Sequence, residues 1–156
     1  SHGRRIGVRR ARPLLENIAT LIDPPGSSQT ELDWTRAILD ATGCDLLLDL
    51  HNLYANAVNF GYDAAAFIRR LPAERIAAVH IAGGRWIGRV LDDHLHDVPD
   101  AVYALLTIVG QVAPRPLTVV LERDGHYPSM EELLAQIDRA RAALASGREA
   151  CHVAWV

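Results

Sequence analysis

The chain has 156 residues, of which 49% are hydrophobic and 22% are charged, a composition that argues against wholesale disorder. Its formal net charge of -3 lacks the basic footprint that nucleic acids and anionic membranes need in a partner. Five arginines do cluster within residues 4–12, and we interpret residues 1–11 as a solvated, flexible N-terminus.

The two cysteines, Cys44 and Cys151, form neither a CxxC motif nor a disulfide framework, so we expect free thiols in a reducing, cytoplasmic setting. No stretch approaches the roughly 18 apolar residues of a membrane span, so no membrane partner is expected. The chain starts with Ser1-His2-Gly3 instead of an initiator methionine, which we interpret as a cleavage scar or a cut edge.

The first half of the chain predicts two strands separated by a helix. An apolar run at residues 13–18 ends in polar side chains and is typical of a strand. A helix is expected over 31–42, with Thr30 placed to cap its start and Gly43 to end it. The second strand, 45–50, is nearly all apolar, as is typical of a strand buried on both faces.

The same alternation continues through the second half. A helix capped by Asp63 should run to about Leu71, and the strand 76–81 follows it. A helix from about Pro99 to Val112 then precedes the strand 117–122.

The last helix has the clearest signals. Ser129 and Glu132 form a capping box, after which apolar residues recur at helical spacing. Residues 147–156 are expected to form a C-terminal tail, in which Cys151 to Val156, with Trp155, would add a further β segment.

The predicted order, βαβαβαβα, indicates a parallel sheet with right-handed crossovers. No GxGxxG or P-loop follows the first strand, which disfavours a nucleotide-binding sheet. We therefore expect residues 1–156 to form a single α/β domain with a core of about 12–145. Its fold would be the (βα)4 half of a TIM (β/α)8 barrel, with parallel strands and the helices outside. Because a half barrel leaves two open edges, a partner or a second copy should complete it.

Acids and imidazoles recur at the ends of the predicted strands. Glu16, Asp49, His80 and Glu122 are each separated from the next by one strand–helix unit. In a parallel barrel this spacing gathers the four side chains on the C-terminal face, where such enzymes place their sites. The loop 91–97 opens on the same face and adds further carboxylates and imidazoles.

Carboxylates and imidazoles without cysteines suit iron, manganese or zinc. Acids gathered around one pocket would repel each other without a metal, and metal binding removes that cost. A core histidine would account for His80 alone, and an ion pair with Arg123 would account for Glu122 alone. The repeated strand-end position therefore carries the prediction. Weaker candidates, as groups around the ligands or as extra ligands, are His51, His96, Asp124 and His126.

Several segments occur in a fixed order along the chain: Leu15–Ile18, Leu47–Tyr54, Asn56–Gly61, His80–Gly83, Asp92–His94 and Leu121–Asp124. Together they closely resemble the multinuclear non-heme iron-dependent oxidative enzymes, the family that includes the methanobactin biosynthesis oxidase. The resemblance runs from about Arg12 to Arg141, and the ordered set is far more specific than any single motif.

Members of this family are xylose-isomerase-like TIM barrels with two or three irons. They use dioxygen to modify residues, often cysteines, of ribosomally synthesised precursor peptides in natural product biosynthesis, and a partner protein commonly delivers the peptide. The resemblance thus implies an oxidoreductase with iron, for which zinc or manganese could substitute. It implies the metal ligands Glu16, Asp49, Asn52, His80, Asp92, His94 and Glu122, and it suggests that Glu16 bridges two metals.

Two departures from the family pattern matter. Gly84 stands where the family usually has a histidine, so no ligand is expected at that position. Family members are nearly twice as long, and two further histidine ligands come from their N-terminal half. The chain resembles strands five to eight, so at least one metal site should be incomplete in it. This predicts a homo-oligomer or a complementary N-terminal half-barrel as partner.

Two other functions fit the same residues. A sugar-isomerase-like barrel also places Glu, Asp and His at strand ends, but it would use magnesium or manganese without dioxygen. A truncated, non-catalytic metal-binding or assembly module would self-associate through the exposed face of the half barrel. Metal identity, dioxygen consumption and oligomeric state distinguish the three functions.

Overall fold

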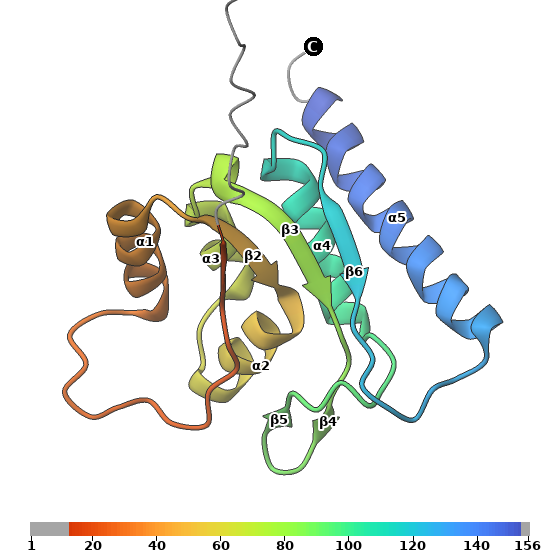
Figure 1. The fold of residues 1–156 in the computed structure, drawn as a ribbon, viewed down its shortest axis with the longest axis horizontal. Helices are drawn as coiled ribbons and strands as arrows, with labels where there is room; N and C mark the ends of the chain where they lie inside the picture. Colours follow the sequence, from red (N-terminus) through yellow and green to blue (C-terminus); the bar gives the residue numbers. More distant parts are fainter. Residues whose placement is uncertain (1–12, 154–156) are drawn as a thin grey trace, which may run out of the picture.

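The computed structural model describes residues 13–153, which have an α/β fold (Figure 1). Four parallel strands form one sheet and neighbour each other in chain order: β1 (Leu14–Glu16), β2 (Asp45–Asp49), β3 (Ile76–Ile81) and β6 (Thr118–Leu121). Because every neighbouring pair is parallel, all four strands end at the same edge of the sheet. The predicted basic N-terminus and the flexibility of residues 1–11 fall outside the described part.

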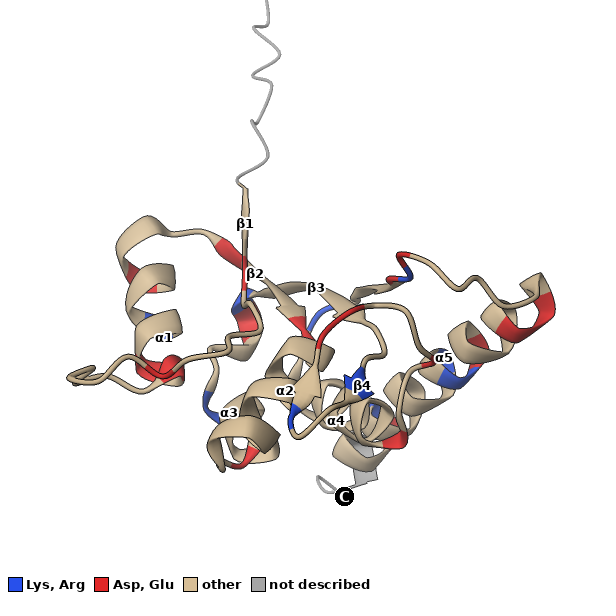
Figure 2. Cartoon of the chain, turned by 90° about the horizontal axis from the view of Figure 1, so that it is seen from below, with Lys and Arg blue, Asp and Glu red and all other residues tan. Residues whose placement is uncertain are grey.

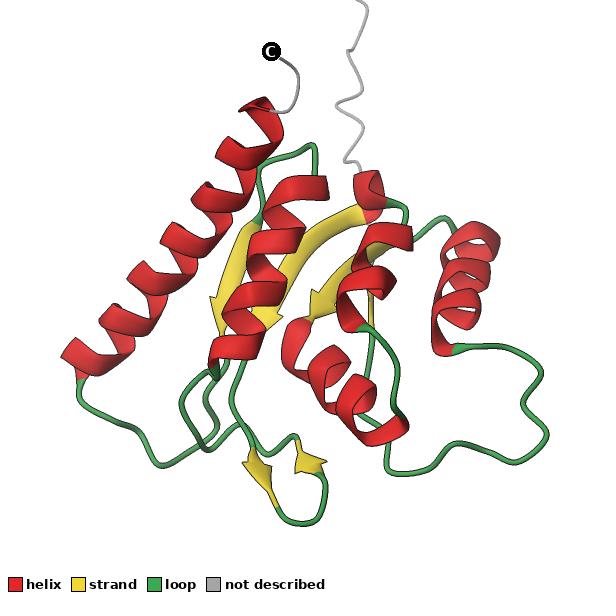
Figure 3. Ribbon diagram, turned by 180° about the vertical axis from the view of Figure 1, so that it is seen from behind, coloured by secondary structure: helices red, strands yellow, loops and turns green. Residues whose placement is uncertain are grey.

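The described part contains five α-helices and one 3-10 helix: α1 (Glu31–Thr42), α2 (Leu50–Phe60), α3 (Ala64–Arg70), η1 (Ala73–Arg75), α4 (Asp100–Val112) and α5 (Met130–Val153). Helices α2, α3 and α4 cover one face of the sheet, as Figure 3 shows from behind. The view from below in Figure 2 separates the strands from this helical layer. None of the helices in residues 13–153 is long and apolar enough to cross a bilayer.

The hydrophobic core lies between the sheet and its covering helices. Leu46 and Leu48 of β2 are buried on this side, together with Val79 of β3. The intervening residue Leu47 points to the opposite face and is only partly buried, while Val120 of β6 is 41% exposed. The apolar sequence of β2 suits burial on both faces, but in the described residues no helix covers the second face (Figure 1).

The long helix α5 packs along α4 beside β6. The two backbones approach closely at Gly110 and Gly147, since a Cβ on Gly110 would lie 2.5 Å from the carbonyl oxygen of Leu144. Helix α5 continues through Cys151 to Val153, so the predicted β segment is wrong for these residues. Trp155 lies outside the described residues.

All four predicted strands and the predicted helices over 31–42, 63–71 and 99–112 occur in the structure. Two elements are additional: helix α2, which starts directly after β2, and the hairpin of β4 (Arg85–Trp86) and β5 (Val90–Leu91). Most side chains of helix α2 are buried, including three polar ones, and the helix follows β2 with no loop between them.

Candidate metal centre

Four side chains from the ends of the four parallel strands meet at the C-terminal edge of the sheet. Glu16, Asp49, His80 and Glu122 each offer one ligand atom, and these atoms lie within 4.8 Å of one another. The Nδ1 atom of His80 is 3.2 Å from an oxygen of Glu16 and 3.1 Å from one of Glu122. The amide of Glu122 donates to the carbonyl of Ile81 (2.9 Å), which holds the glutamate beside the end of β3.

A second group of possible ligands shares Glu122 with the first. His94, Glu122 and Asp124 also bring one ligand atom each within 4.8 Å of the others. The Nδ1 atom of His94 is 3.7 Å from Oε1 of Glu122, whereas Oε2 of the same carboxylate faces His80. Glu122 is therefore the member common to both groups, with one oxygen toward each.

Asp49 is fully buried and starts helix α2. One oxygen, Oδ1, accepts the backbone N–H of Asn52 at 2.7 Å and so caps the helix. The other oxygen, Oδ2, has no hydrogen-bond partner among the described residues. Burial raises the pKa of the Asp49 carboxyl from 3.8 to about 6. A buried carboxylate with a free oxygen is costly alone and suits a cation.

Asp92, in the loop after β5, connects an interior helix to the cluster. Its Oδ1 atom is 2.5 Å from Nδ1 of His51, a buried residue of α2, and 2.9 Å from Nε2 of His94. Partial burial alone would lower the pKa of His94, but the surrounding carboxylates, Asp92 foremost, outweigh burial and raise that pKa. The loop reaches this arrangement with His94 at a φ of 53°, in the left-handed region.

Buried polar atoms without hydrogen-bond partners concentrate at this edge. Within residues 13–153 they include Oδ2 of Asp49, Oδ1 of Asn52, Nδ1 of His80 and Nε2 of His94. The two imidazole nitrogens lie close to carboxylate oxygens, but their alignment is not that of a hydrogen bond. Buried polar atoms without hydrogen-bond partners are costly, and a bound metal ion would satisfy several of them at once. This set of nitrogen and oxygen donors suits iron, manganese or zinc. The residues therefore fit a metal.

Asn17, which sequence reasoning did not single out as a site residue, holds two of these groups in place. Its side-chain amide donates to the carbonyl of Asp49 and accepts the amide N–H of Asp49, both at 2.9 Å. Its backbone carbonyl accepts the Asn52 side-chain N–H at 3.0 Å. The Oδ1 atom of the same Asn52 amide has no hydrogen-bond partner in the described residues. The available signal was a polar residue near the end of the predicted strand 13–18, next to Glu16, and this residue is buried.

The other predicted neighbours of the ligands are placed differently. His51 contacts Asp92 as described above, and Asp124 lies 3.4 Å from His94. His96 pairs with Asp93 (3.0 Å), and His126 packs edge-on to His96 with ring centroids 6.4 Å apart. In the described residues neither His96 nor His126 has an ion pair with a predicted ligand.

Gly84, the position where the resemblance would place a histidine, has no room for a side chain. A Cβ there would lie 2.6 Å from Cε1 of His51 and would overlap the backbone carbonyl of Leu91. The buried His51 and the returning strand β5 therefore occupy the space beside residue 84.

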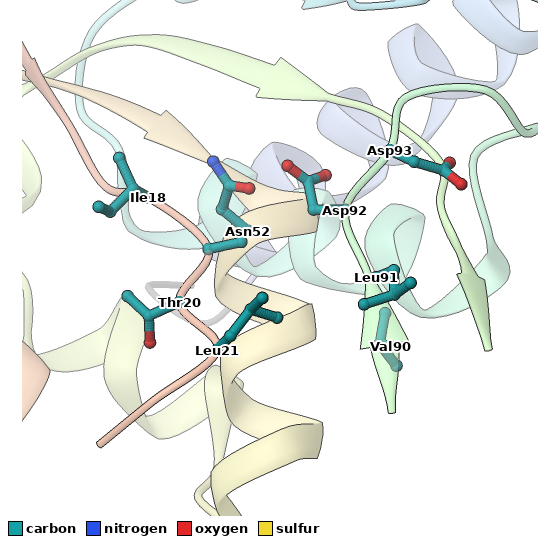
Figure 4. Close-up of a pocket in the computed structure, with 9 residues that line it drawn as sticks. Ile18, Thr20, Leu21, Asn52, Val90, Leu91, Asp92 and Asp93 are labelled. Atoms are coloured by element: carbon teal, nitrogen blue, oxygen red, sulfur yellow. The ribbon is translucent and has the colours of Figure 1, made fainter. Parts of the chain in front are cut away.

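A cavity of about 460 Å³ adjoins the cluster (Figure 4). The loop after β1 forms one wall and strand β5 forms the other, with Asn52 between them. The lining residues are Ile18, Ala19, Thr20, Leu21, Asn52, Val90, Leu91, Asp92 and Asp93. The cavity thus shares Asn52 and Asp92 with the predicted ligand set.

Comparison with known proteins identifies a family that matches most of this chain. A family model described as RiPP precursor modification enzyme MbnB/TglH/ChrH matches residues 7–145. The chain is 41% identical over 147 residues to a UPF0276 protein of Shewanella amazonensis, which covers 89% of this chain and 52% of the relative. A UPF0276 protein of Pseudomonas aeruginosa is 42% identical over 134 residues, 83% of this chain and 46% of the relative. The chain therefore spans about half the length of these curated relatives.

Proposed function

Because the chain belongs to the family of RiPP precursor modification enzymes MbnB/TglH/ChrH, we propose that it carries the metal site of an iron-dependent oxidase. The substrate would be a residue, such as a cysteine, of a ribosomally synthesised precursor peptide. The observation that carries this proposal is the meeting of four strand-end side chains around unsatisfied buried donor atoms. The family description supports the peptide substrate, and the cluster supports the metal.

Two overlapping groups would hold the metal ions. Glu16, Asp49, His80 and Glu122 would form one site, and His94, Glu122 and Asp124 would form the core of a second. Asn52 stands beside them with its Oδ1 unpaired within the described residues, and Asp92 contacts His94 of the second group. Bound iron would supply redox chemistry, with dioxygen accepting the electrons removed from the substrate. Glu122, common to both groups, would help to hold both ions, whereas Glu16, to which the resemblance assigns the bridging role, belongs to the first group.

The chain's own residues prepare this site in three ways. The carboxylates supply the negative charge that the cations neutralise. His51 fixes the orientation of Asp92, and Asn17 fixes Asp49 together with Asn52. Full burial of Asp49 keeps water away from that side of the cluster.

The fold supports a further part of the proposal, namely a half barrel that needs completion. The sheet ends in β1 on one side and β6 on the other, and its second face carries only partly buried apolar residues such as Leu47. Half the length of the relatives fits one (βα)4 half of an eight-stranded barrel. A complementary N-terminal half-barrel or a second copy would close it, and a partner protein would deliver the peptide.

Anaerobic reconstitution with Fe(II), followed by metal counting and iron spectroscopy, tests the function. We expect bound iron in the unaltered chain and sharply lower uptake in Asp49→Ala and Glu122→Ala. Asp138→Ala, which removes an exposed acid on α5, is the matched control and should bind iron normally. Equal iron content in all four proteins would contradict the proposal.

The same preparation distinguishes the alternatives. Turnover that needs magnesium or manganese but no dioxygen would indicate isomerase chemistry instead. A stable dimer by light scattering that takes up no metal would indicate an assembly module.

A further inference from the structure

We propose that the cavity beside the cluster is a specificity subsite, which binds the apolar side chain of the peptide residue next to the one being modified. This inference rests on the proposed function, because it takes the substrate to be a peptide that reaches the metal. It goes further because it proposes where the side chain of the neighbouring peptide residue binds and that this side chain is apolar.

The position of the cavity carries the first step. Asn52 and Asp92 belong to its lining (Figure 4). Each also contacts a member of the cluster, because the backbone N–H of Asn52 donates to Asp49 and Asp92 lies 2.9 Å from His94. Asn52 is more than nine-tenths buried, and its Oδ1 atom has no hydrogen-bond partner in the described part of the chain. A group in the cavity therefore lies beside Asn52 and Asp92, two of the predicted metal ligands.

The walls of the cavity are fixed, and helix α2 fixes both of them. The side chain of Asn56 binds the loop wall, through Ile18 O (2.9 Å) and Thr20 N (2.8 Å). The side chain of Asn59 binds the other wall, exchanging two hydrogen bonds of 2.9 Å with the backbone of Val90. The space between them is thus built into the fold, as is usual for ligand sites of this size.

The chemistry of the walls selects the occupant. Ile18, Leu21, Val90 and Leu91 contribute aliphatic surface. The two acids in the lining already have partners, because Asp92 contacts two histidines and Asp93 pairs with Arg85 and His96. Among the residues that the structure describes, no lysine or arginine lines the cavity. A neutral, apolar side chain therefore matches the aliphatic walls, whereas an acidic one would lie beside Asp92 and Asp93.

The rim favours a peptide that runs across the opening. Ile18 and Leu21 are 66% and 60% exposed, although both line the cavity. Arg89 of the hairpin donates to the carbonyl of Leu21 at 2.9 Å and joins the two walls at one end. This bond ties the hairpin to the loop after β1, while Asn52 and Asp92 of the lining border the cluster, which suits a side chain anchored by a residue at the metal.

The test uses the chain loaded with Zn²⁺, a diamagnetic ion, and capped dipeptides as probes. Acetyl-Cys-Leu-amide and acetyl-Leu-Cys-amide are compared with the two counterparts that contain Asp in place of Leu. Binding is measured by calorimetry and by methyl NMR shifts. We expect one leucine dipeptide to bind about tenfold more tightly than its aspartate counterpart, because an aliphatic side chain is buried. Methyl shifts are expected at Ile18, Leu21 and Val90.

Variants at the exposed rim assign the preference to the cavity. Leu21→Asp and, separately, Ile18→Asp should remove most of the tenfold preference while leaving Zn²⁺ binding unchanged. Leu134→Asp is the matched control, since Leu134 is a leucine on α5 with half of its surface exposed and should keep the preference.

Each result has a distinct meaning. Failure of the chain to bind Zn²⁺ would overturn the proposed function and, with it, this subsite. Zn²⁺ binding with equal affinity for leucine and aspartate dipeptides, or with no dipeptide binding, would overturn the subsite alone. A preference that survives both rim variants, with shifts elsewhere, would also overturn it.

Discussion

Replacement of Asp49 by asparagine should stabilise the metal-free protein while abolishing tight metal binding. Asp49 is fully buried, and burial raises its pKa from 3.8 to about 6. Each pKa unit corresponds to about 1.4 kcal/mol, so at neutral pH the ionised Asp49 costs the folded state about 3 kcal/mol. The asparagine side chain carries no charge and retains the oxygen that caps α2.

The raised pKa of Asp49 fixes the direction in which folding stability changes with pH. Because the pKa of Asp49 is higher in the folded state than in the unfolded chain, the folded state holds a proton that the unfolded state releases between about pH 4 and pH 6. Stability is therefore lost as the pH rises through this range. Asp49→Asn removes this loss, so the variant should gain about 2–3 kcal/mol over the metal-free parent at pH 7 and little near pH 4.

Urea unfolding of both metal-free proteins at the two pH values measures this difference, since titrating groups remote from Asp49 cancel between parent and variant. The variant should also lose the stabilisation that metal gives the parent. A variant that is less stable than the parent at pH 7, or a stability difference that does not change with pH, would refute the reasoning about Asp49.

Four further substitutions probe the groups around the ligands. His51→Ala removes the 2.5 Å partner of Asp92 and should weaken metal binding about 10–100-fold, as measured by metal titration. Gly84→Ala places a Cβ against His51 and should destabilise the protein by about 1–3 kcal/mol, measured as a lower urea midpoint. Asn17→Ala and Asn56→Ala should lower the melting temperature similarly, because each amide loses several buried hydrogen bonds. Only Asn17→Ala should weaken metal binding, and equal metal affinity in these two variants would contradict the role of Asn17.

The sequence predicts the strand-end part of the cluster because a parallel α/β order leaves little freedom there. Once 45–50 and 76–81 are identified as neighbouring parallel strands, Asp49 and His80 must lie at the same level, and they pair in the observed register. The same rule places Glu122 at this edge, one strand further on, where its backbone N–H donates a hydrogen bond to the carbonyl of Ile81. Local patterns and topology agree here, so the prediction needs no side-chain detail.

The remainder depends on contacts that no periodicity encodes. Helix α2 follows β2 without an intervening turn, because Asp49 is both the last residue of the strand and the cap of the helix, so no turn signal in the sequence separates the two elements. The hairpin of β4 and β5 has strands of two residues each, too short for an alternating pattern. Asn17 acts through a pair of hydrogen bonds to the backbone of Asp49, a residue 32 positions away, and only the folded chain brings them together.

Helix α2 links the metal cluster to the cavity. Asn52, Asn56 and Asn59 lie at spacings of four and three residues, which places them on one face of the helix. The first stands at the cluster, the second binds the loop after β1, and the third binds β5. Asp49 caps the same helix with one oxygen and offers the other to a metal. Any movement of α2 that accompanies metal binding would therefore shift both walls of the cavity together, so the affinity for an apolar side chain should depend on whether metal is bound.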